Sequence, residues 1–279
     1  MDELLEQSYE IYRRAIAEHE PYAVVCMISG GDDSLTAYHV AKAIGIKLDG
    51  VMHVNTRTGI PDTNRFVRET FSHENFIEAD ASDTYEREVL SRGFMGMGVK
   101  NHSRAFHLLK AGPYRRAVSK HFRQGKAGRK VLLLNGARSK ESKNRTVNIS
   151  SDMNPDTGCA NNIWTNIIHH WTKDDCHRFL NRVGACRNPV ARELCRSGEC
   201  MCGTMQSKAA RVEASYLFPE WGQWLDDLEA RVMQKYPWGW GENIPDSWSR
   251  WKSGQGDFLY DGLMPMCTDC KREEDSDAD

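Results

Sequence analysis

The stretch from Tyr22 to Leu35, YAVVCMISGGDDSL, places a glycine turn directly between an apolar strand and a helix. Val24 to Ile28 form a short apolar run with β-branched residues, which is typical of a buried parallel strand. Gly30 and Gly31 allow the chain to adopt positive φ and to come close to a phosphate. Strand, turn and helix together present backbone N–H groups and a helix N-terminus to one anion. The stretch therefore predicts a phosphate site, with an ordinary glycine turn as the alternative.

The polar side chains of this turn add to its chemistry. Ser29 and Ser34 bring hydroxyl donors, and Asp32 lies beside them. Asp33 is placed either to cap the helix that follows, from Leu35 to Ile44, or to hold a metal ion bound to a nucleotide. The lysine of a Walker phosphate loop is missing and the spacing differs, so a different class of nucleotide site is indicated.

Strands alternate with helices along the first half of the chain. Besides the strand just described, the patterns predict strands at Gly50–Val54, Phe76–Ala79 and Val131–Leu134, and helices at 2–18, from Pro61, and at Asp83–Leu90. This alternation predicts an α/β fold, a doubly wound parallel sheet covered by helices on both faces. Ligands of such sheets bind at the carboxyl ends of the strands, so Ser29–Ser34 and Asn55–Thr63 are expected on one rim.

Length and composition bound the remaining organisation. The 279 residues suffice for one large domain with an extension, and we expect a nucleotide-binding domain at 1–185, a cysteine-rich extension at 186–271 that is mostly helical or irregular, and a disordered acidic tail at 272–279. The sequence has no apolar run of about 18 residues and its N-terminus, MDELLEQSYE, has no apolar core of a signal peptide. We therefore expect a cytoplasmic protein with reduced or metal-bound cysteines.

The segment from Lys100 to Lys130 is strongly basic and contains no Asp or Glu, although the whole chain has a formal net charge of −2. This predicts a positive face that contacts a polyanion such as nucleotide phosphate or a nucleic-acid backbone. The alternative is a solvated helix face paired with acidic neighbours. The residues predicted to contact nucleic acid are Arg104, Lys110, Arg115, Arg116, Lys120 and Arg123.

Four segments in order resemble one superfamily. SGGDDS resembles the SGGxDS loop of the adenine nucleotide alpha hydrolase superfamily, or N-type ATP pyrophosphatases, which includes the PAPS reductases. NTRTGIPDT resembles the second motif of the PAPS reductase family, with Asp62 in place of the usual Glu. GARSKESKNR resembles its G-x-R-x-x-[QE]-S-x-x-R segment. Ile163 to Leu180 resembles a further family stretch, with Ile167 where a proline would stand.

The resemblance covers about residues 22 to 180 and implies an adenine nucleotide, ATP with Mg²⁺, at the rim of the sheet. The predicted nucleotide-binding residues are Ser29, Gly30, Gly31, Asp32, Asp33, Ser34, Asn55, Thr58, Gly59, Gly136, Arg138, Ser142 and Arg145. The residues predicted to be catalytic are Asp33, Ser34, Arg138 and Arg145, the two arginines because they would offset phosphate charge from the far side of the nucleotide.

Five of the nine cysteines form two groups outside these motifs, and their spacing predicts a metal centre. A Cys-x-x-Cys pair lets two thiolates face one metal, and soft thiolate ligands select zinc or iron–sulfur. The family adds weight to a [4Fe–4S] cluster, with zinc as the alternative. The candidates are Cys195, Cys200, Cys202, Cys267 and Cys270, of which one is left over, either Cys195 as a spare thiol or persulfide carrier, or Cys200. The isolated Cys26, Cys159, Cys176 and Cys186 are predicted to be buried as small hydrophobes.

The arrangement of cysteines and basic residues is most similar to the DndC/SspD-like proteins of DNA phosphorothioation. That similarity implies an ATP pyrophosphatase that adenylates a backbone oxygen of DNA for replacement by sulfur, with a cysteine desulfurase and other phosphorothioation proteins as partners. The alternatives are a PAPS or APS reductase, an ATP-dependent tRNA thiolation enzyme, and a non-enzymatic sensor on the same scaffold. The reductase alternative is weakened because the sequence shows neither the E-C-G-x-H context of the reductase cysteine nor an adjacent Cys-Cys pair.

Overall fold

The fold is built around one six-stranded sheet. The computed structural model describes residues 1–139 and 151–248. The strand order is β3-β2-β1-β4-β6-β5, in which all neighbours are parallel except β5 and β6, which pair antiparallel. The strands are β1 Ala23–Ile28, β2 Gly50–Asn55, β3 Phe76–Asp80, β4 Val131–Asn135, β5 Met153–Asp156 and β6 Cys159–Asn166.

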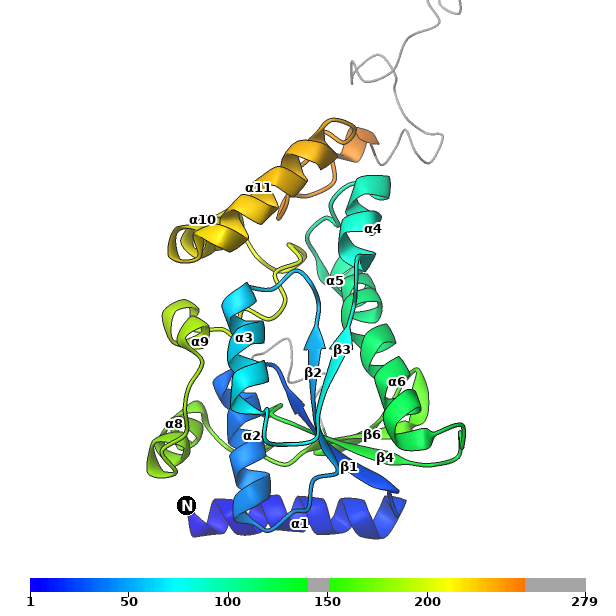
Figure 1. Ribbon diagram of the computed structural model, residues 1–279, viewed down its shortest axis with the longest axis vertical. Helices are drawn as coiled ribbons and strands as arrows, with labels where there is room; N and C mark the ends of the chain where they lie inside the picture. Colours follow the sequence, from blue (N-terminus) through cyan, green and yellow to red (C-terminus); the bar gives the residue numbers. More distant parts are fainter. Residues whose placement is uncertain (140–150, 249–279) are drawn as a thin grey trace, which may run out of the picture.

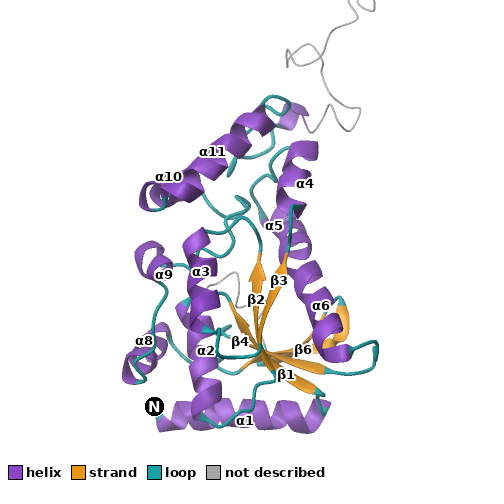
Figure 2. Cartoon of the chain, in the orientation of Figure 1, coloured by secondary structure: helices purple, strands orange, loops and turns teal. Residues whose placement is uncertain are grey.

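Helices cover both faces of the sheet and its carboxyl end (Figure 1 and Figure 2). Those of the N-terminal half are α1 Asp2–His19, α2 Asp32–Ala43, α3 Pro61–Thr70, α4 Thr84–Arg92 and α5 Val99–Phe106. The α5 helix continues without a break through the π-helical turn η1 His107–Ala111, α6 Gly112–Val118 and the π-helical turn η2 Ser119–Arg123. The others are α8 Lys173–Arg182, α9 Pro189–Leu194, α10 Lys208–Leu217 and α11 Pro219–Met233.

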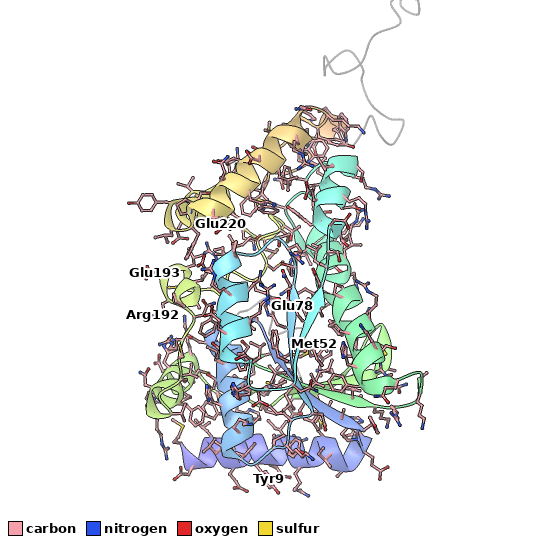
Figure 3. The ribbon with its side chains drawn as sticks, in the orientation of Figure 1. Tyr9, Met52, Glu78, Arg192, Glu193 and Glu220 are labelled. Carbon is pink, nitrogen blue, oxygen red and sulfur yellow. The ribbon has the colours of Figure 1, made fainter. Side chains whose placement is uncertain are left out.

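Alternating apolar side chains of the strands build one core on each face of the sheet. Cys26 and Leu134 pack with apolar residues of α1, α2, α3 and α8 on one face. Val25, Met52 and Leu133 point to the other face and pack against α6 and the turns on either side of it. Figure 3 shows Met52 inside the sheet layer, whereas Arg192 and Glu193 project from the surface of α9. Strands buried on both faces explain why the sequence reads as continuous apolar runs.

A third core lies beyond the carboxyl ends of β2 and β3, where α10 and α11 close the top of the molecule in Figure 1. Trp221, Trp238 and Trp240 are each at most 1 % exposed there. The indole N–H of Trp238 donates to the carbonyl of Phe94, and that of Trp240 donates to the carbonyl of Met201. These tryptophans therefore pack in the interior and offer no stacking face to a nucleic-acid base.

The α/β fold and the four predicted strands are confirmed, and three details of the sequence interpretation are wrong. The helix after the glycine turn begins at Asp32 rather than Leu35. The pattern of 207–235 predicts one helix, but the segment forms two, because α10 ends at Leu217 and Pro219 starts α11. The pair β5 and β6 was not predicted. Among the described residues, no helix has the length and apolar character needed to cross a membrane.

Candidate nucleotide site

The strand order reverses between β1 and β4, and the loops that leave these two strands meet at this point. Strands β2 and β3 lie on one side of β1, and β4 and β6 on the other. Such a switch point opens a crevice at the carboxyl end of a doubly wound sheet, which is where ligands bind. Gly136, just after β4, packs so closely that a Cβ there would lie 2.4 Å from the carbonyl carbon and oxygen of Asp33. Only glycine permits this approach of the two loops.

The phosphate loop, Ser29–Ser34, is shaped by its own hydrogen bonds. The Ser34 hydroxyl accepts from the Ser29 amide at 3.2 Å and from the Ser29 hydroxyl at 3.1 Å, and donates to the Gly31 carbonyl at 2.8 Å. Gly30 has φ of +80°, and Gly31 is the residue before α2. Helix α2 has no side-chain cap. The first N–H groups of a helix have no partner within it, so an uncapped α2 directs donors at the switch point.

The predicted capping role of Asp33 is wrong, because Asp33 lies inside α2 and its carboxylate pairs with Arg138 instead. Arg138 Nη2 lies 3.0 Å from Asp33 Oδ2, and the Arg138 side chain is only 7 % exposed. The pair joins the loop after β1 to the loop after β4 across the switch point. The alternative role of Asp33, as a ligand of a nucleotide-bound metal, stays a prediction.

Asp32 is held by an arginine and a histidine that sequence reasoning missed. Its carboxylate accepts from Arg187 Nε at 2.9 Å and from Arg187 Nη2, and it lies 3.1 Å from His177 Nε2. His177 belongs to α8 and Arg187 to the linker between α8 and α9. More than 140 positions separate these partners in sequence. The one available signal was Asp32 itself, because a carboxylate in a phosphate loop needs a counter-charge.

The second rim loop, Asn55–Thr63, lies where it was predicted, but its polar groups are already engaged. Asn55 donates to Glu78 at 2.8 Å and accepts from the Arg57 amide at 3.0 Å. Thr58 is fully buried, and its hydroxyl accepts from the Met201 amide at 3.1 Å. A Cβ on Gly59 would lie 2.2 Å from the carbonyl oxygen of Glu199. In this structure Asn55, Thr58 and Gly59 shape the rim and hold another segment against it.

That segment is the cysteine segment, Cys195–Gly203, which follows α9 and runs along the rim without regular secondary structure. Six consecutive carbonyls, from Ser197 to Cys202, each accept a hydrogen bond from another part of the chain. The donors are, in order, Thr63 Oγ1, the Ile60 amide, Thr56 Oγ1, Gln206 Nε2, Trp240 Nε1 and the Tyr85 hydroxyl. Buried backbone groups must be paired, and here side chains and loops replace a ladder. The segment also borders the phosphate loop, since a Cβ on Gly31 would lie 3.3 Å from Ser197 Cβ.

Two of the five candidate metal-binding cysteines lie together in the interior of this segment. Cys202 is 2 % exposed, and its sulfur lies 3.2 Å from the Thr204 hydroxyl. The hydrogen bond from Cys200 and the neighbouring His102 and Thr204 lower the pKa of Cys202, while the same bond and burial raise the pKa of Cys200. Cys195 is exposed at the end of α9, with φ of +53°.

The described residues do not complete a metal centre. Within 1–139 and 151–248 no three His, Cys, Asp or Glu residues gather closely enough to hold a metal ion. Cys200 and Cys202 would supply half of the predicted four-cysteine set, and the other two, Cys267 and Cys270, lie outside the described residues. Two predicted nucleotide-binding residues, Ser142 and Arg145, also lie outside them. The iron–sulfur cluster and its zinc alternative therefore stay predictions.

Burial was predicted correctly for two of the four isolated cysteines. Cys26 and Cys176 are fully buried, and burial raises the pKa of both thiols, that of Cys176 to about 12. Cys186 is exposed and Cys159 is half-buried, so the prediction is wrong for these two. Both lie outside the apolar faces of the strands and helices that bury the others.

The basic segment meets acids that lie elsewhere in the sequence. Lys110 Nζ lies 2.9 Å from Glu199 Oε2, and Arg115 Nε donates to Asp156 at 2.9 Å. Arg104 pairs with Glu88, and Arg123, 5 % exposed, donates to Asn162. Arg116 and Lys120 are exposed, as is Arg104. Contact with nucleic acid stays a prediction, which the structure narrows to these three exposed side chains.

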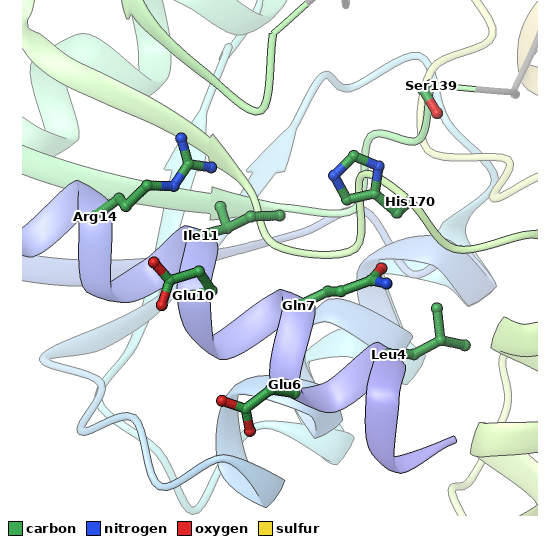
Figure 4. Close-up of a pocket in the computed structure, with 8 residues that line it drawn as sticks. All are labelled: Leu4, Glu6, Gln7, Glu10, Ile11, Arg14, Ser139 and His170. Atoms are coloured by element: carbon green, nitrogen blue, oxygen red, sulfur yellow. The ribbon is translucent and has the colours of Figure 1, made fainter.

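A separate open pocket of about 700 Å³ lies between α1 and the segments that follow β4 and β6 (Figure 4). Its wall joins one face of α1 to Ser139 and His170, which follow β4 and β6. Glu6, Glu10 and Arg14 give it mixed charge. It does not include the phosphate loop.

Residues 23–205, about two thirds of the chain, match the phosphoadenosine phosphosulfate reductase domain family. The chain belongs to this family. The matched range runs from the first residue of β1 past Cys202, so the family domain includes both the phosphate loop and the cysteine segment. The PAPS reductase family is one of nucleotide-binding enzymes, which agrees with the glycine turn, the switch point and the arginine that faces it.

Solved structures with similar chain traces have low sequence identity to this family member. The phosphoadenylyl-sulfate reductase from Candida auris, in a phosphate complex, is 15 % identical with a TM-score of 0.47, over 66 % of this chain and 83 % of that one. The FMN adenylyltransferase from Candida glabrata, with FMN and an ATP analogue, is 12 % identical with a TM-score of 0.46, over 68 % and 60 %. The NMN synthetase from Francisella tularensis is 12 % identical with a TM-score of 0.45, over 80 % and 94 %. No curated protein matches the sequence.

Proposed function

We propose that this PAPS reductase family member is an ATP pyrophosphatase that adenylates an oxygen of the DNA backbone, so that sulfur can replace it. One observation supports the proposal most directly. The phosphate loop, the Arg138 loop and the cysteine segment meet on one rim of the sheet. An anion site and a set of thiols side by side suit a reaction in which nucleotide activation is followed by a sulfur step.

The first step uses groups of the switch point. The uncapped start of α2 and the amides of the phosphate loop bind the β- and γ-phosphates that leave as pyrophosphate. Arg138 offsets negative charge that develops on the α-phosphate and the leaving group. Mg²⁺ is usually bound by one or two carboxylates together with substrate phosphates, and Asp33 supplies such a carboxylate at the loop. The ion would draw charge from the phosphates, a role that Arg138 shares.

The second step needs a sulfur donor and an acceptor that reaches the rim. We propose a cysteine desulfurase as the source of sulfur, and DNA as the acceptor. The exposed Arg104, Arg116 and Lys120 lie along the helix from α5 to η2, where they suit a phosphate backbone. Adenylation of tRNA would use the same site and differs only in the acceptor.

A sulfonucleotide reductase is the second candidate, because the family is named for that reaction and the cysteine segment lies inside the matched range. In that reaction a thiol attacks the sulfur of bound PAPS rather than a phosphorus atom. The phosphate loop would then hold the nucleotide phosphates without cleaving them.

The two candidates are separated by their products. With ATP, Mg²⁺, short duplex DNA and sulfide, adenylation of the DNA oxygen releases pyrophosphate, and attack of sulfide on the adenylated phosphorus releases AMP together with that oxygen. We expect both products, and a loss of at least about a hundredfold for Asp33→Ala and Ser34→Ala. Asp174→Ala, an exposed aspartate at the start of α8, is the matched control and should keep full turnover. Sulfite release from PAPS with a thiol reductant, without AMP formation from ATP, would replace the proposal by the second candidate. AMP formation that survives both loop variants would place the site elsewhere.

A further inference from the structure

Two adjacent carboxylates stand at the start of α2, where the phosphate loop is expected to bind an anion. Asp32 and Asp33 are the first two residues of the helix. Each one is paired with an arginine from a distant segment, Asp33 with Arg138 and Asp32 with Arg187. Arg187 belongs to none of the motifs that indicate nucleotide binding.

The contact between Asp32 and Arg187 is two-pronged and partly shielded from water. Arg187 Nε donates to Asp32 Oδ1 at 2.9 Å, and Arg187 Nη2 donates to Asp32 Oδ2. The Asp32 side chain is 15 % exposed and that of Arg187 is 24 % exposed. His177 Nε2 lies 3.1 Å from the same carboxylate. Two parallel N–H···O bonds fix the orientation of both groups more firmly than a single contact would.

Neighbouring residues hold Arg187 in this place. The next residue, Asn188, is fully buried and caps α9 by accepting from the Val190 amide at 3.1 Å. Asn188 Nδ2 donates to Thr63 Oγ1 on the second rim loop at 3.1 Å, and it lies 3.1 Å from where a Cβ on Gly30 would stand. The backbone that carries Arg187 is therefore attached to the rim beside the phosphate loop.

An uncompensated carboxylate at this position would work against an anion. The start of a helix attracts negative charge, so a free Asp32 would compete with a phosphate group for the same field and would repel it at short range. A bidentate arginine cancels that charge locally and keeps the carboxylate engaged.

We propose that Arg187 is a positioning residue of the phosphate loop, which neutralises Asp32 and, together with His177, holds it in place so that α2 can accept a polyphosphate. This inference rests on the proposed function only in that the loop binds phosphate groups, and it holds for either nucleotide chemistry. Arg187 acts through Asp32, and removal of the Asp32 charge therefore makes Arg187 dispensable.

The test is a charge-compensation cycle read by calorimetric binding of inorganic pyrophosphate and of ATP with Mg²⁺ to the full chain. We expect Arg187→Gln to weaken both by at least about tenfold, since a charge within a few ångströms of the anion is left uncompensated. Asp32→Asn should tighten binding. The double variant, Asp32→Asn with Arg187→Gln, should bind within about threefold of the wild type.

Two further variants separate this role from a purely structural one. Arg187→Lys keeps the charge but loses the two-pronged contact, so we expect its binding to fall between that of the wild type and that of Arg187→Gln. Arg178→Gln removes an arginine of α8 that pairs with Asp175 at the surface, and should bind like the wild type. Thermal unfolding of each variant checks that the fold is retained.

Each outcome decides one claim. If the double variant binds as weakly as Arg187→Gln, the inference is overturned, because Arg187 would then act on the anion itself or on the fold. If Arg187→Gln binds like the wild type, the inference is overturned as well. Wild-type protein that binds pyrophosphate in this pattern but makes no AMP would leave the inference standing and overturn the proposed function. Failure of the wild type to bind either anion would overturn both.

Discussion

The phosphate loop and the cysteine segment are neighbours on one rim, yet they are held in opposite ways. The phosphate loop is stabilised by bonds among Ser29, Gly31 and Ser34, all within six positions. The cysteine segment takes most of its hydrogen bonds from residues that lie far away in sequence, such as Thr56 at a separation of 143 positions, whereas the one from Gln206 is local. One part of the site forms locally, and the other exists only after the whole fold has closed around it.

This difference predicts which part of the site is fragile. The backbone turn of the phosphate loop is closed by its own serines, and it is the side chains of Asp32 and Asp33 that pair with distant segments. A segment bonded to several distant elements loses many contacts when any one of them moves. We therefore expect substitutions at the cysteine segment to affect global stability, and substitutions in the phosphate loop to affect ligand binding and turnover first.

The largest effect is expected for Gly59→Ala. The new methyl group would lie 2.2 Å from the Glu199 carbonyl oxygen and 2.7 Å from that of Gly198, so backbone must separate from backbone. We expect the free energy of unfolding to fall by about 4 kcal/mol, measured by urea denaturation. Gly128→Ala is the control, because nothing lies within 4 Å of its added Cβ. Equal stabilities of the two variants would contradict a tight contact at Gly59.

The next effect is expected for Lys110→Met. This change leaves the Glu199 carboxylate, which is only 6 % exposed, without its cation. Loss of one partner of a buried pair costs about 3 kcal/mol, because the remaining charge stays away from water. The double variant, with Glu199→Gln added, should recover more than half of that loss. If the second change recovers nothing, Lys110 stabilises the segment by packing rather than by charge.

A smaller loss of stability is expected for Ser34→Ala. The change removes the acceptor of the Ser29 amide and hydroxyl and the donor to the Gly31 carbonyl. We expect about 1 kcal/mol of stability to be lost, because the groups left unpaired belong to Ser29 and Gly31, which are only half-buried and can bond to water, while release of pyrophosphate falls steeply. Urea denaturation and turnover of the same sample separate the two effects. A stability loss as large as that of Gly59→Ala would remove the contrast between the regions.

The mildest probe is chemical labelling of thiols at pH 8, first in the wild-type protein and then in Gly59→Ala. Cys186 and Cys195 are exposed and should react within minutes. Cys26 and Cys176 should react only on unfolding, because they are buried and burial raises the pKa of both thiols. Tryptic mass spectrometry assigns the labels. In Gly59→Ala we expect Cys202, which is buried in the wild type, to become reactive before Cys26, and simultaneous labelling of the two would contradict local detachment of the segment.

What the sequence predicted well is what short stretches determine. The apolar run before Ser29 and the glycines after it fix a strand and a turn within ten positions, so β1 and the glycine turn were found with little error. The rim position of the Asn55 loop followed from the parallel sheet. The start of α2 was placed late, because Asp32 and Asp33 read as loop residues and their stabilising partners are distant.

The remaining features depend on contacts that no local pattern contains. Lys100 to Lys130 has no acid of its own, but the fold brings Glu88, Asp156 and Glu199 to it. The pairing of Asp32 with Arg187 depends on the path of the linker after α8. Burial of Cys200 and Cys202 depends on tryptophans and tyrosines of other elements. Such contacts are determined by the topology of the fold, and the spacing of residues along the sequence does not predict them.

The hydrogen bond from Trp221 Nε1 to the Thr58 carbonyl, 3.0 Å long, has a consequence for synthesis of the protein. Thr58 leaves the ribosome long before Trp221, so the nascent chain carries a half-built rim until α11 emerges. A fragment that ends at residue 205, where the family match ends, would keep the phosphate loop but lack the indole over Thr58. During synthesis, the rim is therefore completed only after α11 has emerged and Trp221 has packed over Thr58.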